Sequence, residues 1–332
     1  MLIDNEAKTF LKNISDGNVR LDEPMSRHTS LRTGGTADLF AEPERLEILV
    51  DIVKWTSAKR IPYLIIGGGS NLLVRDNGIR GLVISLKKGL NCITENRTND
   101  VCVEVSADAG VKLQRLCSFA INKGLEGMNF ALGIPGSVGG AIMMNAGTEH
   151  GFMEKVLKSV NVLMADGKIE KIDKTNLDFR YRELAWKLER NKGAINRSSN
   201  RSSNRSSNQS SNRPIIISGK FLLTRNEPAK LKKEAELILG ARNRKQPTNL
   251  PSAGCFFRNP QSSMTAGELI DKAGLKGKIM GGARISLKHA NFIINSEKAS
   301  AADIIALMEE AQERVYRLFN IVLEPEVKIV GE

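Results

Sequence analysis

The stretch from residue 62 to residue 76 carries the side chains and backbone best suited to ligand chemistry in this sequence. It holds an apolar run followed by five residues that are small or polar: Gly67, Gly68, Gly69, Ser70 and Asn71. Three glycines without side chains let the backbone approach a ligand and present its N–H groups to an anion. The serine and the asparagine add side-chain donors. The pattern predicts a phosphate or pyrophosphate site, and the alternative is a glycine-rich turn without a ligand.

Two familiar phosphate-binding loops do not fit this stretch. Leu72 stands where the third glycine of the dinucleotide-binding pattern G-x-G-x-x-G would be. No G-K-S/T follows, so the loop is not that of a P-loop nucleotide hydrolase. The phosphate hypothesis therefore depends on the rest of the chain.

A second glycine-rich region runs from residue 124 to residue 151 and holds eight glycines and one proline. It lies beside apolar Ile134, Val138 and Ile142, whereas a disordered linker would be polar throughout. Backbone with so few side chains could wrap a flat or extended ligand. A third cluster, residues 33–36, is a turn with hydroxyl and backbone donors.

The elements that would position these loops follow from apolar spacing. Helices are expected over 44–59, 111–123, 229–242 and 265–272, with a further long helix after residue 300; residues 1–26 should form a helix and a polar lead-in. Strands are expected over 63–66, 81–86, 101–106 and 214–223, with a hairpin over 156–172 and a final strand near the C-terminus. Capping residues are Thr265 with Glu268, and Ser300 with Asp303.

Residues 197–212 are four copies of a tetrapeptide, three RSSN and one QSSN. The segment has no apolar residue, so it cannot bury a core and is predicted to be a disordered surface insertion. Long flexible loops are tolerated at little free-energy cost. Contacts of its arginines with RNA or membrane are the alternative.

Composition bounds the possible function. The chain of 332 residues is long enough for two or three domains, and no apolar run approaches the length of a membrane span. We expect no secretory signal. Because the four cysteines form no C-x-x-C pair, we also expect no metal site and a cytoplasm that keeps the thiols reduced. A net charge of +12 with only 5% aromatic residues favours an anionic small substrate over nucleic acid.

Eight motifs resemble, in order along the chain, those of the UDP-N-acetylenolpyruvoylglucosamine reductases of peptidoglycan synthesis. They are TSLRTGG (29–35), GGGSNLL (67–73), GIPGSVGGA (133–141), NAG (145–147), YR (181–182), PSAGCFFRNP (251–260), KHANFIIN (288–295) and LEPEV (323–327). No single motif is decisive, whereas eight in the right order are specific. The resemblance is to the family form that lacks an extra tyrosine-bearing substrate loop.

This resemblance implies an α+β protein. Its FAD-binding domain would be of the two-lobed vanillyl-alcohol-oxidase (PCMH) type, followed by a smaller C-terminal α/β substrate-binding domain. The implied boundaries are 1–85 for the first lobe, 86–225 for the second lobe with its insertion, 226–322 for the substrate-binding domain, and 323–332 for a strand that carries Glu326 into the active site.

The resemblance also implies FAD as the cofactor and NADPH as co-substrate. The implied reaction is the cytoplasmic reduction of UDP-N-acetylglucosamine enolpyruvate to UDP-N-acetylmuramate. Three of the motifs are implied to hold FAD: Thr33, Gly34 and Gly35; Gly67, Gly68, Gly69, Ser70 and Asn71; and Gly133, Pro135, Gly136, Ser137, Gly139, Gly140 and Ala141.

The reaction needs hydride at the β-carbon of the enolpyruvyl group, stabilisation of charge on its carboxylate, and a proton at its α-carbon. By resemblance, Arg182 and Glu326 hold the carboxylate. The family usually has a proton-donating serine where this chain has Cys255. A thiol, with a reference pKa of about 8.5, can donate the proton instead.

A second departure from the family is Leu184, where a serine often follows the YR motif. Lys245, Asn259 and Arg242 are expected to bind the diphosphate or sugar of the substrate, and Lys328 could add positive charge. We expect a monomer without nucleic acid or stable membrane association. The alternatives are another FAD-dependent oxidoreductase of the same fold, and an RNA-binding protein that uses the RSSN segment.

Overall fold

The computed structural model describes residues 19–97, 101–186 and 213–332. The helix expected before residue 19 and the RSSN insertion lie outside the described residues. The chain divides into two units. The first contains Ala41–Gly67 and Val83–Leu239 together with Val19, and the second contains Arg20–Phe40, Gly68–Leu82 and Gly240–Glu332.

The first unit contains an antiparallel sheet with the strand order β12-β11-β15-β7-β6, and β8 also pairs with β15. Its strands are β6 (Ile93–Arg97), β7 (Cys102–Asp108), β8 (Leu125–Glu126), β11 (Leu157–Leu163), β12 (Ile169–Asp173) and β15 (Ile215–Arg225). Alternate residues of β7 are buried, as expected for a strand with one face on a core. The hairpin predicted around Asp166 and Gly167 is confirmed by the pairing of β11 with β12.

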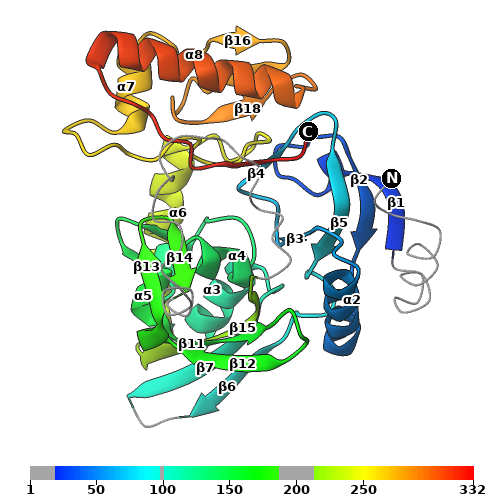
Figure 1. Cartoon of the computed structure of the whole chain (residues 1–332). Helices are drawn as coiled ribbons and strands as arrows, with labels where there is room; N and C mark the ends of the chain where they lie inside the picture. Colours follow the sequence, from blue (N-terminus) through cyan, green and yellow to red (C-terminus); the bar gives the residue numbers. More distant parts are fainter. Residues whose placement is uncertain (1–18, 98–100, 187–212) are drawn as a thin grey trace. The chain divides into compact units, whose positions relative to one another are not determined.

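Helices cover one face of this sheet, where α4 and α5 contact β15 (Figure 1). The helices of this unit are α2 (Leu46–Ala58), α3 (Leu113–Asn122), α4 (Val138–Met143), α5 (Met153–Val156) and most of α6 (Pro228–Lys245). The apolar face predicted for α3 is the buried face, and it includes Cys117. Burial raises the pKa of the Cys117 thiol to about 12, so this cysteine is a core residue.

Shorter elements complete the first unit. Strand β3 (Tyr63–Ile66) leads into the first glycine-rich loop, and β13 (Leu177–Arg180) forms a hairpin with β14 (Glu183–Trp186). The others are 3-10 turns at Asn129–Ala131 and Lys174–Asn176 and the paired strands β9 (Gly147–Thr148) and β10 (Gly151–Phe152).

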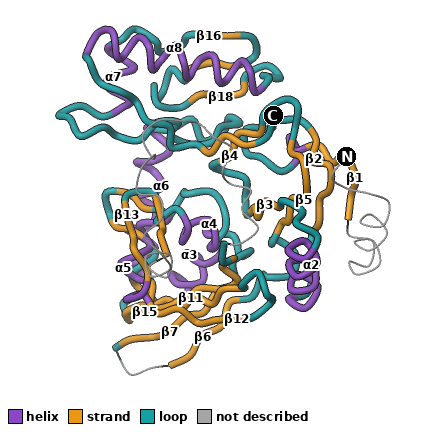
Figure 2. The backbone as a smooth tube through the Cα atoms, in the orientation of Figure 1, coloured by secondary structure: helices purple, strands orange, loops and turns teal. Residues whose placement is uncertain are grey.

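In the second unit, α8 (Ala301–Phe319) runs along a sheet with the order β16-β17-β18, as Figure 2 shows. The strands are β16 (Ile279–Met280), β17 (Ala283–Ile285) and β18 (Ile293–Asn295), and α7 (Ala266–Lys272) also packs on α8. Both predicted caps are confirmed, because Thr265 with Glu268 and Ser300 with Asp303 form capping boxes. A buried apolar cluster joins these elements to Phe256 and Phe257.

The rest of the second unit comprises β1 (Val19–Pro24), a 3-10 turn at Met25–Arg27, β2 (Thr36–Ala41), β4 (Leu72–Val74), the start of β5 (Ile79–Ser85) and β19 (Lys328–Val330). The expectation of a polar lead-in up to residue 26 is wrong for β1, which forms a sheet with β2 and β5. A C-terminal strand is present, since β19 pairs in parallel with β4, but it covers only Lys328–Val330 and not the implied 323–332, and Glu326 precedes it.

Candidate active site

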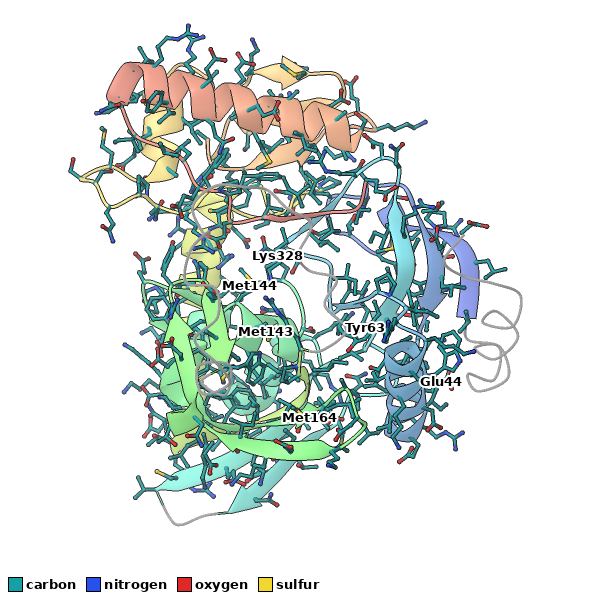
Figure 3. All side chains as sticks on the ribbon, in the orientation of Figure 1. Glu44, Tyr63, Met143, Met144, Met164 and Lys328 are labelled. Atoms are coloured by element: carbon teal, nitrogen blue, oxygen red, sulfur yellow. The ribbon has the colours of Figure 1, made fainter. Side chains whose placement is uncertain are left out.

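The two glycine-rich regions touch each other inside the first unit. A Cβ atom built on Gly67 would lie 2.0 Å from Oγ of Ser137, so only glycine fits here without a shift. The strand before Gly67 carries Tyr63 (Figure 3), which is 4% exposed. Burial raises the pKa of the Tyr63 phenol, which therefore stays neutral. Gly67 and Ser137, both predicted to contact the cofactor, are thus brought together.

The second half of the first glycine-rich loop belongs to the other unit. Gly69 has a φ of +62°, and a Cβ atom built on it would lie 1.9 Å from the carbonyl oxygen of His28. The Gly69 carbonyl accepts the backbone N–H of Ser30 at 3.1 Å. The positive φ of Gly69 and its close approach to the His28 carbonyl both require glycine at this position. The loop is therefore held against the TSLRTGG segment.

Asn71 lies beside the C-terminal strand. Its side-chain amide donates to the carbonyl of Glu326 at 3.2 Å, and its own carbonyl accepts the backbone N–H of Lys328 at 3.1 Å. Lys328 itself is exposed (Figure 3). The structure thus brings together a residue predicted to contact FAD and a predicted catalytic residue, which lie 255 positions apart in the sequence.

The second glycine-rich region leads into the short helix α4. Ser137 is its N-cap, and its hydroxyl accepts the backbone N–H of Gly140 at 3.4 Å. Gly139 packs so closely on Ala109 that an added Cβ would lie 2.8 Å from the alanine Cβ. Gly133 and Gly136 have φ angles of +75° and +117°, a region that favours glycine. Residues 133–141 therefore include four glycines, whose backbone carries no side chain that could block a ligand.

Gln114 organises this region and was missed by sequence reasoning. Its Nε2 donates to the carbonyls of Ala131 and Ile134 at 3.1 and 2.8 Å, and its Oε1 accepts the N–H of Gly133 at 3.1 Å. One side chain therefore holds three backbone groups of the loop. In the sequence Gln114 is one of several polar residues of α3, between Leu113 and Arg115, and nothing there identifies its partners.

Arg182 lies in the two-residue turn of the β13–β14 hairpin, in the left-handed region with a φ of +59°. Its Nη1 donates to the Gly147 carbonyl at 2.9 Å, and its guanidinium carbon lies 5.2 Å from the Tyr181 ring centroid. Buried Asn145 donates to the Arg180 carbonyl at 3.2 Å. The YR and NAG motifs are therefore one structural group.

Leu184 is 5% exposed on β14, where it pairs with Phe179. Its side chain is part of the core of the first unit. The departure from the family at this position therefore has a packing role, and the Arg182 turn is intact beside it.

Cys255 and Glu326 belong to the second unit, and their segments are joined through the residue after the cysteine. The backbone N–H of Glu326 donates to the Phe256 carbonyl at 2.8 Å, and Phe257 forms a β-bridge with Pro325. Cys255 and Glu326 are both half-buried. The predicted thiol and carboxylate are thus carried by adjacent segments that one isolated β-bridge joins.

The residues expected to bind the diphosphate or sugar are less closely grouped. Arg242 and Lys245 lie in the last turns of α6, where Lys245 is exposed and Arg242 half-buried. Asn259 is exposed, and its Oδ1 accepts the backbone N–H of Ala266 at 3.1 Å. That contact fixes the asparagine at the start of α7.

Thr33, Gly34 and Gly35 line a cavity of about 530 Å³ in the second unit, together with residues at the start of α8. The Thr33 hydroxyl donates to the Ala299 carbonyl at 2.6 Å. Added Cβ atoms on the two glycines would lie 2.6 Å from the Val74 Cβ and 2.2 Å from the Asp76 carbonyl oxygen. These contacts account for the glycines by packing, without a ligand.

The described residues supply backbone N–H groups, a guanidinium, a thiol and a carboxylate. These groups can bind an anion, stabilise developing negative charge and move a proton. Within the described ranges, no cluster of His, Cys, Asp and Glu could hold a metal ion, and no helix is long and apolar enough to cross a membrane.

Two family models match the chain. Residues 37–173 match the FAD binding domain, and residues 246–330 match the C-terminal domain of UDP-N-acetylenolpyruvoylglucosamine reductase. The predicted fold class, an FAD-binding domain followed by a smaller C-terminal domain, is confirmed by these matches together with the solved relative below.

Full-length relatives agree with the family models. The chain is 41% identical over 331 residues to UDP-N-acetylenolpyruvoylglucosamine reductase of Desulfosudis oleivorans, covering 99% of this chain and 100% of that protein. It is 39% identical over 335 residues to the enzyme of the same name from Clostridium botulinum strain 657, covering 99% of each. The crystal structure of the Thermus caldophilus reductase superposes with a TM-score of 0.73 at 31% identity, covering 94% of this chain and 98% of that one.

Proposed function

Because the chain belongs to the family of UDP-N-acetylenolpyruvoylglucosamine reductases, we propose that it reduces UDP-N-acetylglucosamine enolpyruvate to UDP-N-acetylmuramate. It is an oxidoreductase that uses FAD, with NADPH as co-substrate. The reaction is a step of peptidoglycan synthesis, which we place in the cytoplasm and assign to a monomer. The match to the C-terminal domain of the reductase disfavours the alternative, another FAD-dependent oxidoreductase of the same fold.

The FAD-binding family model, which matches residues 37–173, covers both glycine-rich loops. Packing against Ser137 and Ala109 requires glycine at Gly67 and Gly139, and the positive φ of Gly133 and Gly136 favours glycine there, so these positions carry no side chain that could block a ligand. We therefore assign the loops 67–71 and 133–141 to FAD. Thr33, Gly34 and Gly35 are assigned to FAD by the motif alone, because packing already accounts for them. When bound, FAD supplies two-electron chemistry, carrying hydride from NADPH to the β-carbon of the enolpyruvyl group.

Arg182 is the residue we assign to the substrate carboxylate. A guanidinium can donate two parallel hydrogen bonds to a carboxylate, and these strengthen as negative charge builds on the oxygens. The hydrogen bond to Gly147 and the contact with the Tyr181 ring orient this side chain within its turn. The Arg182 guanidinium would therefore be in place before substrate binds.

Cys255 and Glu326 are assigned to the same carboxylate and its α-carbon. The observation that carries the assignment is the 2.8 Å hydrogen bond from the Glu326 N–H to the Phe256 carbonyl, which keeps the two segments adjacent. The Cys255 thiol gives its proton to the α-carbon, and the resulting thiolate is reprotonated from solvent. Glu326 must be protonated or neutralised by Arg182 when the substrate carboxylate is close, because like charges repel.

The nucleotide-sugar is assigned to the cations and amide near α6 and α7. Lys245 and Arg242 can neutralise the diphosphate, the lysine as a point charge and the arginine as a two-pronged donor. Asn259 presents its free amide nitrogen while its oxygen holds the Ala266 N–H. The net charge of +12 would attract this anionic substrate.

The experiment that tests this proposal measures NADPH oxidation and product mass with the purified protein. We expect NADPH oxidation only when the enolpyruvyl nucleotide-sugar is present, and a product heavier than the substrate by two hydrogens. Phosphoenolpyruvate, which lacks the nucleotide-sugar, should not support oxidation. Equal NADPH oxidation with and without the nucleotide-sugar would contradict the proposed substrate.

A further inference from the structure

Asn291 forms a closed pair of hydrogen bonds with the backbone of Phe257. The Phe257 N–H donates to Oδ1 of Asn291 at 2.9 Å, and Nδ2 of Asn291 donates to the Phe257 carbonyl at 2.8 Å. The Asn291 carbonyl also accepts the N–H of Phe256 at 2.9 Å. Asn291 is 3% exposed, so all these groups are removed from water. One residue therefore holds both residues that follow Cys255.

The opposite side of this segment is held by residues 324–326, which precede β19. The Phe256 carbonyl accepts the N–H of Glu326 at 2.8 Å, and the Arg258 N–H donates to the Glu324 carbonyl at 2.9 Å. Phe256 and Phe257 have 0% and 2% exposed surface and belong to the core cluster of the unit. The segment after Cys255 thus lies between Asn291 on one side and Glu326 on the other.

The segment before Cys255 is held as well. The Ser252 carbonyl accepts the Ser30 hydroxyl at 2.6 Å, and Ser252 forms a β-bridge with Ile294. Between Ser252 and Cys255, Gly254 has a φ of +82°, and no atom lies within 4 Å of the position that its Cβ would take. The Cys255 backbone is therefore held from both sides, and Phe256 and Phe257 on its C-terminal side are the residues that Asn291 holds.

From this arrangement we propose that Asn291 is the positioning residue for proton transfer by Cys255, an inference that rests on the proposed function. Its amide keeps the Cys255 segment in register with Glu326. Of the uncharged side chains, a carboxamide such as that of Asn291 presents a donor and an acceptor side by side, as the Phe257 backbone requires. Asn291 itself does not touch the reacting atoms, and it acts through the backbone of Phe256 and Phe257.

The test compares Asn291→Leu and Asn291→Asp with Asn295→Leu. Asn295 is a second buried asparagine of the same motif, which accepts the Ala299 N–H and donates to the Leu31 carbonyl. The Asn295 backbone N–H also donates to the Pro251 carbonyl at 3.0 Å, a bond that leucine keeps, so loss of the side-chain bonds should destabilise the same unit while Phe256 and Phe257 stay held by Asn291. Asn291→Asp is the conservative variant, because a protonated carboxyl can both donate to and accept from Phe257, whereas a carboxylate cannot donate.

Two readouts separate positioning from simple destabilisation. The first is anaerobic reoxidation of the NADPH-reduced enzyme by substrate. Displacement by about 1 Å costs about 100-fold, so we expect a loss of that order for Asn291→Leu, with NADPH bleaching unchanged. The second is the alkylation rate of Cys255 by iodoacetamide, measured by peptide mass spectrometry with exposed Cys92 as internal standard. We expect Asn291→Leu, and not Asn295→Leu, to change the ratio of the Cys255 rate to the Cys92 rate.

Asn291→Asp adds a pH signature. Its reoxidation rate should approach wild type at low pH and fall as the introduced carboxyl ionises, after correction for the wild-type profile, which includes titration of neighbouring His289. Unchanged reoxidation and unchanged Cys255 alkylation in both Asn291 variants would overturn the inference. If Asn291→Leu does not fold, the reoxidation and alkylation rates of Asn291→Asp test the inference without it. If Cys255→Ala is reoxidised normally, the proton-donor role fails, while the alkylation ratio still tests positioning.

Discussion

A Cβ atom on Gly67 would lie 2.0 Å from Oγ of Ser137. This contact joins the ends of two glycine-rich loops that are 70 residues apart in the sequence. Ser137 also forms a β-bridge with Lys112, the N-cap residue of α3. Gly67 and the loop 133–141 are therefore packed together within the first unit, and a side chain at Gly67 should disturb both loops.

Gly67→Ala tests this contact. The new methyl group must displace Ser137 or the loop, at a cost of about 1–3 kcal/mol in the free energy of unfolding. We expect less FAD to copurify and a lower thermal midpoint of the FAD-loaded protein. Gly240→Ala is the control, because its Cβ would lie 3.5 Å from the nearest atom, in the side chain of Arg244 within α6. Equal FAD content in Gly67→Ala and wild type would count against the assignment.

Gln114→Leu tests the residue that holds the second loop. Three backbone groups lose their partner, and Gly133 and Ile134 become free to move. We expect the FAD dissociation constant, measured by flavin fluorescence, to rise by about 10-fold, the equivalent of roughly one net hydrogen bond. Gln114→Glu should also weaken binding, because a carboxylate would face two carbonyl oxygens. Wild-type affinity in both variants would show that the loop does not need Gln114.

Arg182→Lys tests the guanidinium while keeping the positive charge. A lysine cannot donate two parallel hydrogen bonds to a carboxylate, so reoxidation of the reduced enzyme by substrate should slow by about 100-fold. Reduction by NADPH should be unchanged. Arg180→Lys is the matched control, because Arg180 pairs with Asp178 on the surface and is expected to tolerate the change. Equal effects of the two substitutions would remove Arg182 from the site.

Cys255→Ser tests the family departure directly. A serine restores the usual proton donor, so we expect turnover to be retained, and treatment with iodoacetamide should no longer inhibit. Cys255→Ala should keep NADPH bleaching and lose reoxidation by substrate. Iodoacetamide inhibition of Cys255→Ser equal to that of wild type would assign the sensitivity to another cysteine, such as exposed Cys92.

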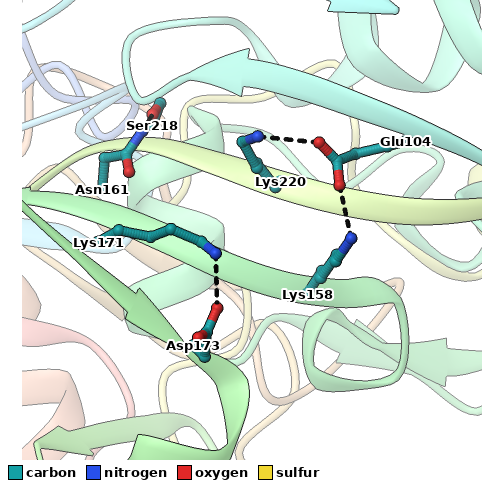
Figure 4. Close-up of polar contacts among 7 residues, drawn as sticks. All are labelled: Glu104, Lys158, Asn161, Lys171, Asp173, Ser218 and Lys220. Carbon is teal, nitrogen blue, oxygen red and sulfur yellow. Dashed lines mark hydrogen bonds and ion pairs between the residues drawn. The ribbon is translucent and has the colours of Figure 1, made fainter. Parts of the chain in front are cut away.

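The ion pairs of Glu104 predict that the first unit loses stability at acid pH. Glu104 pairs with Lys158 at 2.8 Å and Lys220 at 2.9 Å across three neighbouring strands (Figure 4). The hydrogen bonds from Lys158 and Lys220 lower the pKa of Glu104 from 4.5 to about 2. A carboxyl group whose pKa is lower in the folded state stabilises the fold fully above its unfolded pKa, and this stabilisation is lost as pH falls toward the folded pKa.

We therefore expect wild-type stability to fall between pH 4.5 and about 2 partly through Glu104. Glu104→Gln should lower the thermal midpoint at neutral pH and reduce the slope of stability in this acid range. Asp173→Asn is the control, since its pair with Lys171 is more than half exposed on both sides. Parallel pH profiles for wild type and Glu104→Gln would contradict this account.

Local patterns in the sequence predicted many elements of the fold correctly. Apolar spacing located α3 to within two residues, and the two capping boxes marked the starts of α7 and α8. These features depend on residues a few positions apart, so the sequence displays them directly. Strand β1 was missed, because its alternation of apolar and polar residues spans only residues 19–22, and Leu21 within it is exposed.

The site depended on contacts that local patterns cannot show. Asn71 meets Glu326, and Arg182 meets Gly147, through folding of distant segments. Motif order predicted candidate site residues, whereas the hydrogen bonds of Gln114 and Asn291 required coordinates. For Thr33, whose hydroxyl donates to the Ala299 carbonyl, the geometry gives a structural reason for the motif that the sequence alone did not suggest.

The most direct test of the central claim is an anaerobic visible spectrum of the purified protein, recorded before NADPH, after NADPH, and after the enolpyruvyl nucleotide-sugar. The account predicts a flavin spectrum that bleaches with NADPH and returns only when that substrate is added. A protein that binds no FAD on reconstitution, or a reduced flavin that this substrate does not reoxidise, would contradict it.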